Sequence, residues 1–243
     1  MLKKIVLILP LLSLTLIAYN QDEINTFKEH CNNGNGTICS VLGSMYEDGT
    51  DGVAKKKSRA LKYYKKACNS KVNSENIETI GVSCYYTAYF YDNGIGTKIN
   101  RINAITYYRK ACNNKVTQGC YNYSLAYVKG EGVKKDYKKG FKYALKACND
   151  TNTKDDSKTK GCLIVSELYS NGQGVKINKK KAFTYAKKAC HLGSATGCEN
   201  TGVYYTKGIG VKQDYKQMKK YFQKACKKGS KTACKYYKMT KDW

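Results

Sequence analysis

A skeleton of tyrosine, glycine, alanine and cysteine recurs five times along the chain at nearly fixed spacing. Each copy runs from a leading cysteine to a closing cysteine 28 residues later, or 29 residues later in the first copy. Successive closing cysteines are 36 to 44 residues apart. The leading cysteines are Cys39, Cys84, Cys120, Cys162 and Cys198. This regular period predicts a solenoid of stacked units, because each unit has to bury its apolar face against its neighbours.

Each copy has the pattern of two antiparallel helices. In the first copy Leu42, Met45 and Tyr46 fall at i, i+3 and i+4, which is the apolar stripe of one helix, and Tyr63 and Ala67 belong to the stripe of a second. Glycines ten and twelve residues after the leading cysteine end the first helix, since glycine tolerates the positive φ of a tight turn. The first copy has GTDG at this turn in place of GxG. The predicted fold is therefore all-α.

Two further sets of residues fit this arrangement. Small residues four positions after the leading cysteine allow close approach of aromatic side chains from the partner helix: Gly43, Ala88, Ser124, Ser166 and Gly202. Polar residues stand where the N-cap of the second helix is expected: Asn100, Asp136, Asn178 and Asp214. We therefore divide the chain into a signal peptide (1–18), an N-terminal capping helix (22–38), five helix-pair repeats (39–230) and a C-terminal capping helix (231–243).

The first 18 residues have the composition of a secretory signal. Two lysines precede an apolar run from Ile5 to Ile17, which is too short for a membrane span, and Ala18 suits a cleavage site. The alternative is a retained N-terminal anchor. We expect a secreted or periplasmic bacterial protein without stable membrane insertion.

Twelve cysteines in an exported chain predict a disulfide framework. Pairing the ends of each repeat, such as Cys39 with Cys68, leaves Cys31 and Cys234 without partners. Pairing each closing cysteine with the next leading one uses all twelve, and we favour it: Cys31 with Cys39, Cys68 with Cys84, Cys112 with Cys120, Cys148 with Cys162, Cys190 with Cys198, and Cys226 with Cys234. Metal binding is disfavoured, because Cys-x7-Cys is a poor zinc spacing and the chain has only two histidines. No cofactor is expected.

The chain is strongly basic. After removal of residues 1–18 it has 42 Lys and Arg against 18 Asp and Glu, a net charge of +24. This charge draws the protein to acidic surfaces, although a solvated basic face is the better explanation for it. It is spread evenly along the repeats and does not form one run, which argues against a nucleic-acid partner.

With the Tyr, GxG, Ala and paired-cysteine skeleton, the chain resembles the Sel-one-like repeat family over about residues 22–241, and more narrowly its secreted, cysteine-rich Hcp-type members. The resemblance implies a right-handed α-solenoid whose first helices line a concave surface, with Cys-x7-Cys bridges between neighbouring repeats. It also implies penicillin binding or slow β-lactamase activity, with a β-lactam or peptidoglycan fragment as ligand, or action on host cells. The chain departs from the family pattern in the GTDG turn and in two long inter-cysteine segments, 68–84 and 148–162. The geometry of those two joints is therefore an open question.

Catalytic residues are not evident in the sequence. The one Ser-x-x-Lys, Ser157 to Lys160, lies in a hydrophilic insertion, and the SDN and KTG motifs that accompany it in serine β-lactamases are missing. The favoured function is binding of a protein or peptide, acidic or of mixed charge, on the concave face. First-helix positions one, two, five and nine after the cysteine point away from the apolar stripe. The candidate binding residues at these positions are Tyr85, Tyr86, Tyr89, Tyr121, Asn122, Lys129, Asn200 and Lys207.

Overall fold

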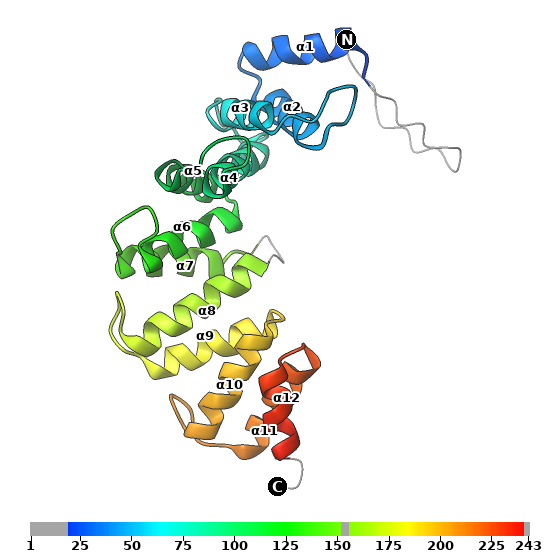
Figure 1. Ribbon diagram of the computed structural model, residues 1–243. Helices are drawn as coiled ribbons and strands as arrows, with labels where there is room; N and C mark the ends of the chain where they lie inside the picture. Colours follow the sequence, from blue (N-terminus) through cyan, green and yellow to red (C-terminus); the bar gives the residue numbers. More distant parts are fainter. Residues whose placement is uncertain (1–18, 152–155, 241–243) are drawn as a thin grey trace, which may run out of the picture.

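The computed structural model describes residues 19–151 and 156–240, which form twelve α-helices and no strand (Figure 1). The helices are stacked side by side into a curved array that runs from α1 at one end to α12 at the other. This architecture confirms the predicted all-helical solenoid. The predicted signal peptide (1–18) and the last three residues of the chain lie outside the described residues.

Five antiparallel helix pairs make up the body of the array. The first helices are α2 (Gly36–Asp48), α4 (Ile77–Asn93), α6 (Thr117–Lys129), α8 (Asp156–Asn171) and α10 (Ala195–Lys207). The second helices are α3 (Lys57–Cys68), α5 (Arg101–Asn113), α7 (Tyr137–Cys148), α9 (Lys179–His191) and α11 (Tyr215–Lys227). A single helix flanks the pairs at each end, α1 (Gln21–Asn32) and α12 (Lys231–Met239).

The first helix of the first repeat begins earlier than the sequence pattern indicated. It starts at Gly36, because the Asn35 side chain accepts a hydrogen bond from the Ile38 amide and caps it. The N-terminal capping helix, expected over 22–38, is α1 and ends at Asn32. Cys39 therefore lies inside α2.

Helix ends follow the predicted glycine and N-cap chemistry. A glycine in the left-handed conformation caps every first helix, with φ between 63° and 79°. In the GTDG turn, Asp51 also takes a positive φ of 57°. All four predicted N-caps accept a hydrogen bond from the amide three residues on, at 2.8 to 3.0 Å: Asn100, Asp136, Asn178 and Asp214.

The second glycine of the turn has a role that the sequence pattern did not indicate. A Cβ on Gly174 would lie 2.3 Å from the Tyr137 carbonyl carbon, and a Cβ on Gly210 would lie 2.1 Å from the Lys179 carbonyl oxygen. Both contacts are with the start of the preceding second helix. Each repeat's turn therefore packs directly on the repeat before it, and only glycine fits there.

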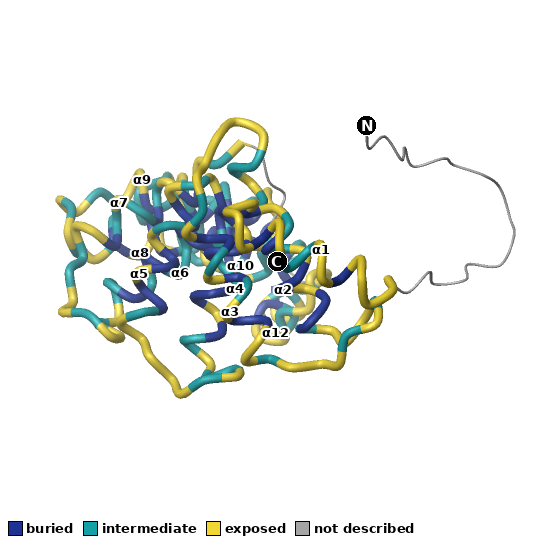
Figure 2. Tube along the Cα trace, turned by 90° about the horizontal axis from the view of Figure 1, so that it is seen from above, coloured by how far each residue is buried: buried dark blue, intermediate teal, exposed yellow. Residues whose placement is uncertain are grey.

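The interior is built from alanine, tyrosine and cysteine, and buried residues lie where helices face one another (Figure 2). In four repeats a first-helix tyrosine stacks on a second-helix tyrosine with ring centres 5.4 to 5.9 Å apart: Tyr46 on Tyr63, Tyr91 on Tyr107, Tyr169 on Tyr185, and Tyr205 on Tyr221. In the third repeat Tyr143 instead meets Tyr123 edge-on at 4.5 Å.

The small first-helix residues serve two packing arrangements. A Cβ on Gly43 would lie 2.6 Å from the Tyr64 ring, so glycine is needed for the predicted aromatic contact. Ser124 and Ser166 each donate a hydrogen bond of 2.7 Å to a backbone carbonyl of the partner helix. In those two repeats the second-helix aromatic is replaced by an alanine, Ala144 or Ala186. The prediction of aromatic contacts therefore does not hold for the two serines.

Every cysteine takes part in one of six disulfides, and each closing cysteine is joined to the next leading one, as the neighbour pairing has it. The two long joints have the same geometry as the short ones. Cα–Cα distances are 4.6 Å at both long joints and 4.4 to 4.8 Å at the short ones. The extra residues lengthen the following first helix: α4 has 17 residues and α8 has 16, against 13 in the other first helices.

Candidate binding faces

The helix pairs give the array two faces. We call the surface of α2, α4, α6, α8 and α10 the first-helix face, and the surface of α3, α5, α7, α9 and α11 the second-helix face. Helix α2 contacts α4 and α6 contacts α8, whereas no two second helices come into comparable contact. Because an array bends toward the side on which its units lie closer, the first-helix face is the concave one.

Three of the predicted binding residues lie together on α4. The ring centre of Tyr85 is 5.7 Å from that of Tyr86 and 6.3 Å from that of Tyr89. Tyr86 also stacks on Tyr64 of α3 at 5.1 Å. Tyr85 and Tyr86 are half-buried and Tyr89 is 39% exposed. The cluster thus presents one exposed ring supported by two rings that the core holds in place.

A groove of about 360 Å³ opens between α2 and α4 beside this cluster, and Glu47, Asp48, Tyr64 and Tyr86 are among the residues that line it. Glu47 accepts a hydrogen bond from the Tyr64 hydroxyl at 2.9 Å and pairs with the Lys57 amine at 3.1 Å. Burial raises the pKa of Tyr64 well above its ordinary value, and the hydrogen bond to Glu47 raises it further. This end of the first-helix face is aromatic and acidic.

The next group of predicted residues lies on α6. Tyr121 is half-buried, and the Lys160 amine lies 5.8 Å from its ring centre. Asn122 is half-buried. Lys129, the last residue of α6, is exposed and pairs with Glu131 at 3.6 Å. An exposed pair of this kind contributes little to stability, so Lys129 can exchange Glu131 for another carboxylate.

A second groove, of about 540 Å³, lies between α8 and α10. It contains the last two predicted residues, Asn200 and Lys207, together with Glu167 and Tyr204. All eight predicted residues thus belong to first helices, but they are distributed over three of them and do not converge on one pocket. Sequence reasoning missed Glu47, Tyr64, Glu167 and Tyr204, which join the grooves only because neighbouring repeats meet there.

The Ser-x-x-Lys sequence lies in a different setting from the one expected. Helix α8 begins at Asp156, so Ser157 and Lys160 are on a packed helix and not in an irregular insertion. Ser157 is only 8% exposed, and the Lys160 amine pairs with Asp156 at 2.7 Å. A serine hydroxyl that is buried to this extent is poorly placed to attack a substrate.

Charge divides sharply between the two faces. The second helices contain 22 Lys and Arg and no Asp or Glu, whereas the first helices contain four Lys and seven Asp or Glu. The charge is therefore even along the chain, as the sequence analysis found, and uneven across each helix pair. The sequence contains this division, and counting the charges of the two helices of each repeat separately would have found it.

In four repeats a lysine two residues before the closing cysteine contacts the C-terminal end of the helix that precedes the pair, which is α1, α3, α5 or α7. Three of these lysines donate to the asparagine that follows the previous closing cysteine: Lys66 to Asn32 at 2.6 Å, Lys110 to Asn69 at 2.5 Å, and Lys188 to Asn149 at 2.8 Å. Lys146 donates to the Cys112 carbonyl oxygen at 2.9 Å. Burial lowers the pKa of Lys146 and of Lys188. These contacts hold ammonium groups beside the disulfides.

Residues 19–151 and 156–240 contain neither a helix that is long and apolar enough to span a membrane nor a group of three or more His, Cys, Asp or Glu placed to hold a metal ion. The solenoid described above is similar to known structures. A protective antigen present in uropathogenic Escherichia coli strains, which displays an SLR fold, has a TM-score of 0.74 and 25% identity over 88% of this chain and 43% of its own. This chain thus spans less than half of that protein.

A Sel1 repeat protein from Oxalobacter formigenes also has a TM-score of 0.74, with 21% identity over 89% of this chain and 83% of its own. Helicobacter pylori cysteine rich protein B is 37% identical over 55% of this chain and 91% of its own, with a TM-score of 0.43. No curated protein matches the sequence.

The sequence also matches the family model described as Sel1 repeat. It does so in five segments, 39–71, 81–116, 117–152, 159–194 and 195–230, which together cover more than half of the chain. Each segment corresponds to one antiparallel helix pair of the array. The chain therefore belongs to the Sel1 repeat family.

Proposed function

We propose that this protein is an exported scaffold that binds an extended segment of a partner protein along its first-helix face. The observation that carries the proposal is the pair of grooves between successive first helices, α2 with α4 and α8 with α10. Both grooves open on the same concave face. A segment lying across that face would pass the Tyr85, Tyr86 and Tyr89 cluster between them.

The tyrosine cluster supports this role. Aromatic side chains anchor many interfaces, since they bury a large area and have few rotatable bonds. Tyr86 is held against Tyr64, so little rotational freedom would be lost when a partner covers it. The six disulfides should also favour binding, because they hold the face rigid and a rigid face loses less conformational entropy when a partner binds.

The charges of the face suit a partner segment of mixed charge. Glu47 and Asp48 line the N-terminal groove, whereas Lys207 stands with Glu167 in the C-terminal one. A purely acidic partner would find few cations here. We expect a basic stretch of the partner near α2 and an acidic stretch near α10.

Export is supported by the cysteines. All twelve are in disulfides, and proteins with such frameworks occur mainly outside the reducing cytoplasm. The signal sequence predicted for residues 1–18 agrees with this location. We therefore place the protein outside the cytoplasm.

Peptide display tests the proposal. Peptides of about twelve residues would be selected on the disulfide-intact protein, and their affinities measured by fluorescence anisotropy. Replacing Tyr85 and Tyr89 by alanine should weaken binding at least about tenfold. Tyr215→Ala, which removes a tyrosine 50% exposed on α11, is the matched control and should change nothing. Equal losses in the two variants would contradict binding on the first-helix face.

Turnover of a chromogenic cephalosporin tests the enzymatic alternative in the same preparations. We expect no hydrolysis that depends on Ser157. If Ser157→Ala abolished a measurable rate while the circular dichroism spectrum stayed unchanged, the scaffold proposal would give way to a hydrolase. Binding of a muropeptide that the Tyr85 and Tyr89 variant retains would likewise place the ligand elsewhere.

A further inference from the structure

Three hollows lined with lysine recur along the second-helix face. The first, of about 420 Å³, lies beside Cys31 and is lined by Lys62, Lys65 and Lys66. The second, of about 560 Å³, lies at the Cys112–Cys120 disulfide and is lined by Lys115, Lys142 and Lys146. The third, of about 550 Å³, lies beside Cys190 and is lined by Lys224, Lys227 and Lys228. We call them the disulfide hollows.

The hollows occupy equivalent places in alternate repeats. Each lies at a joint with the short Cys-x7-Cys spacing, between the end of α1, α5 or α9 and the side of α3, α7 or α11. The repeat that follows each of these joints has lysines six and two residues before its closing cysteine, and all of them except Lys220 line a hollow: Lys62 and Lys66, Lys142 and Lys146, Lys220 and Lys224. One helical turn separates the members of each pair, so both lie on the same side of the helix.

The repeats after the two long joints are built differently. They have Thr106 and Thr184 six residues before the closing cysteine, and each hydroxyl donates to a carbonyl of its own helix. A lysine pair therefore occurs in each repeat that follows a short joint. A threonine takes the place of the first lysine in each repeat that follows a long joint. This coupling would not be expected if the lysines only kept the surface hydrated.

Few carboxylates balance these lysines. The second helices contain none, and the residues lining the first and third hollows include no Asp or Glu. Asp150 lines the second hollow, where it accepts a hydrogen bond from Thr117. Burial lowers the pKa of Lys146 in spite of Asp150, so an anion placed beside its ammonium would relieve an unfavourable environment.

We propose that the disulfide hollows bind the anionic groups of one linear acidic polysaccharide, which runs along the ends of the second helices and occupies a hollow at every second repeat. A flexible chain can follow the convex curve, whereas a flat membrane would touch it over a short arc. The large apolar side chains exposed on second helices are few, Ile102 and Tyr215, which also argues against insertion into lipid.

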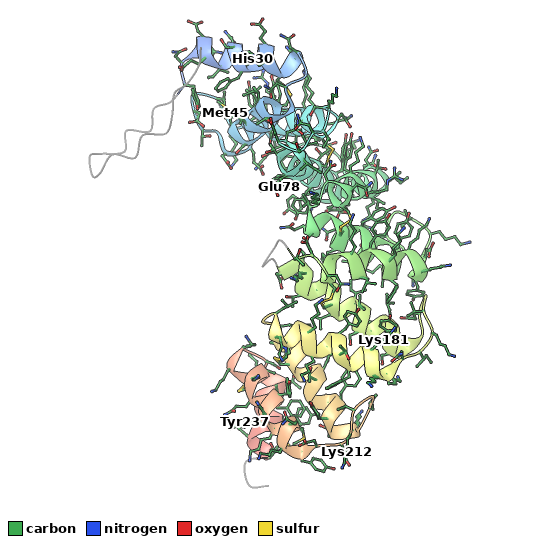
Figure 3. All side chains as sticks on the ribbon, turned by 180° about the vertical axis from the view of Figure 1, so that it is seen from behind. His30, Met45, Glu78, Lys181, Lys212 and Tyr237 are labelled. Carbon is green, nitrogen blue, oxygen red and sulfur yellow. A yellow bond between two sulfur atoms is a disulfide. The ribbon has the colours of Figure 1, made fainter. Side chains whose placement is uncertain are left out.

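The ring contacts of the second helices argue against a nucleic acid. Single-stranded nucleic acids bind largely by stacking bases on exposed aromatic rings. Four second-helix tyrosines are instead stacked on first-helix tyrosines, and cations lie over several rings of these pairs; Lys181, labelled in Figure 3, lies 5.3 Å from the centre of the Tyr169 ring. The first and third hollows have no Tyr, Phe or Trp in their lining, and Tyr143 in the second is half-buried and meets Tyr123 edge-on.

The test compares two variants that each lose six positive charges. The hollow variant replaces Lys62, Lys66, Lys142, Lys146, Lys220 and Lys224 by glutamine, which is polar and lacks the positive charge. The loop variant replaces Lys55, Lys56, Lys98, Lys134, Lys176 and Lys212, which are exposed in the glycine turns at the other end of the second helices. Heparin oligosaccharides of increasing length serve as the probe, with titration calorimetry at several salt concentrations.

Wild-type affinity for heparin should rise steeply with oligosaccharide length once a second hollow is reached, because the second contact is then intramolecular. The hollow variant should lose at least about tenfold more affinity than the loop variant. Equal losses would mean that net charge alone attracts the probe, and would overturn the proposal. A triple variant at Lys62, Lys142 and Lys220 leaves the hydrogen bonds from Lys66 and Lys146 intact and covers the case in which the six-fold variant fails to fold.

Two further probes separate the other polyanions. If vesicles of phosphatidylglycerol and phosphatidylcholine, or single-stranded oligothymidylate, bound tightly while heparin did not, the polysaccharide proposal would be wrong. Peptides selected on the first-helix face should bind the hollow variant with unchanged affinity. The polysaccharide proposal and the proposed function can therefore fail separately.

Discussion

The first-helix face and the second-helix face are built from the same repeat, yet they carry different side chains. The first-helix face has grooves, half-buried tyrosines and a small excess of carboxylates, whereas the second helices contain 22 Lys and Arg and no Asp or Glu. Packing does not demand this difference, because both helices of a pair contribute alanine and aromatic residues to the core. The charge division is thus a property of the surface that the fold does not explain.

The division also has a cost in stability. Like charges four residues apart on a helix destabilise it by about 0.2 to 0.5 kcal/mol per pair. Lys62 with Lys66, Lys142 with Lys146, and Lys220 with Lys224 are all such pairs. A surface retained against this repulsion is better explained by a ligand than by solvation.

The largest effect on stability is expected at the disulfides, on which both faces depend. Replacing Cys112 and Cys120 by alanine should lower the free energy of unfolding by about 2.5 kcal/mol, since the reduced loop gains entropy in the unfolded chain. At Cys148 and Cys162, where the sequence separation is 14 instead of 8, the loss should be about 3 kcal/mol. Urea denaturation of both variants checks the two values. An unchanged urea midpoint would show that these disulfides do not stabilise the array.

The next largest effect is expected at the glycine turns, which contact the N-terminal ends of the second helices. Gly174 has a φ of 71°, and a Cβ there would meet the backbone of α7. Gly174→Ala should therefore lower the free energy of unfolding by about 2 to 3 kcal/mol, as strain adds to overpacking. Gly193→Ala is the control, with a φ of 108° and nothing within 4 Å, and should cost about 1 kcal/mol. Equal thermal shifts would show that the contact between repeats contributes nothing.

Most of the fold was predictable because it rests on local chemistry repeated five times. Each N-cap residue, such as Asp136, bonds to an amide only three residues further along the chain. Each glycine cap likewise acts on the last turn of its own helix. The disulfide pairing followed from neighbour relations in a linear array. Helix starts were less predictable: α2 begins at Gly36 and α8 at Asp156, in segments that were expected to be a capping helix and a polar insertion.

The candidate site was less predictable because it depends on how repeats meet. The α8–α10 groove combines Glu167 and Lys207 from different repeats, and the hydrogen bond from Lys66 reaches Asn32, 34 residues away in the sequence. No local pattern contains such distances. The charge division was present in the sequence, but it appears only when the two helices of each repeat are counted separately.

Two buried tyrosines that donate to carboxylates of the first helices should make the stability of the fold depend on pH in the alkaline range. Burial raises the pKa of Tyr64 and Tyr108, and Glu47 and Asp92, to which their hydroxyls donate, raise it further. Above pH 10 the unfolded chain loses these protons while the folded chain keeps them, so stability falls as the pH rises, by up to about 1.4 kcal/mol per pH unit for each tyrosine. Replacing both by phenylalanine should flatten this slope, whereas Tyr215→Phe should not. Urea denaturation between pH 9 and 11 measures it, and identical slopes would contradict the assignment.

The smallest expected effect is the change in stability when one lysine of each pair is removed, and it tests the difference between the two faces most directly. If the lysine pairs of the disulfide hollows are kept for a ligand, removing one member of each should make the protein more stable. Lys62→Gln, Lys142→Gln and Lys220→Gln together should raise the free energy of unfolding by about 0.5 to 1 kcal/mol at low ionic strength. The gain should vanish in 1 M salt, where the Debye length is about 3 Å. Neutralising Lys129 and Lys207 of the first-helix face, which lack a lysine four residues away, should give no gain. A triple variant that is less stable at low salt would show that these lysines stabilise the fold, and the argument that the second-helix face trades stability for binding would fail.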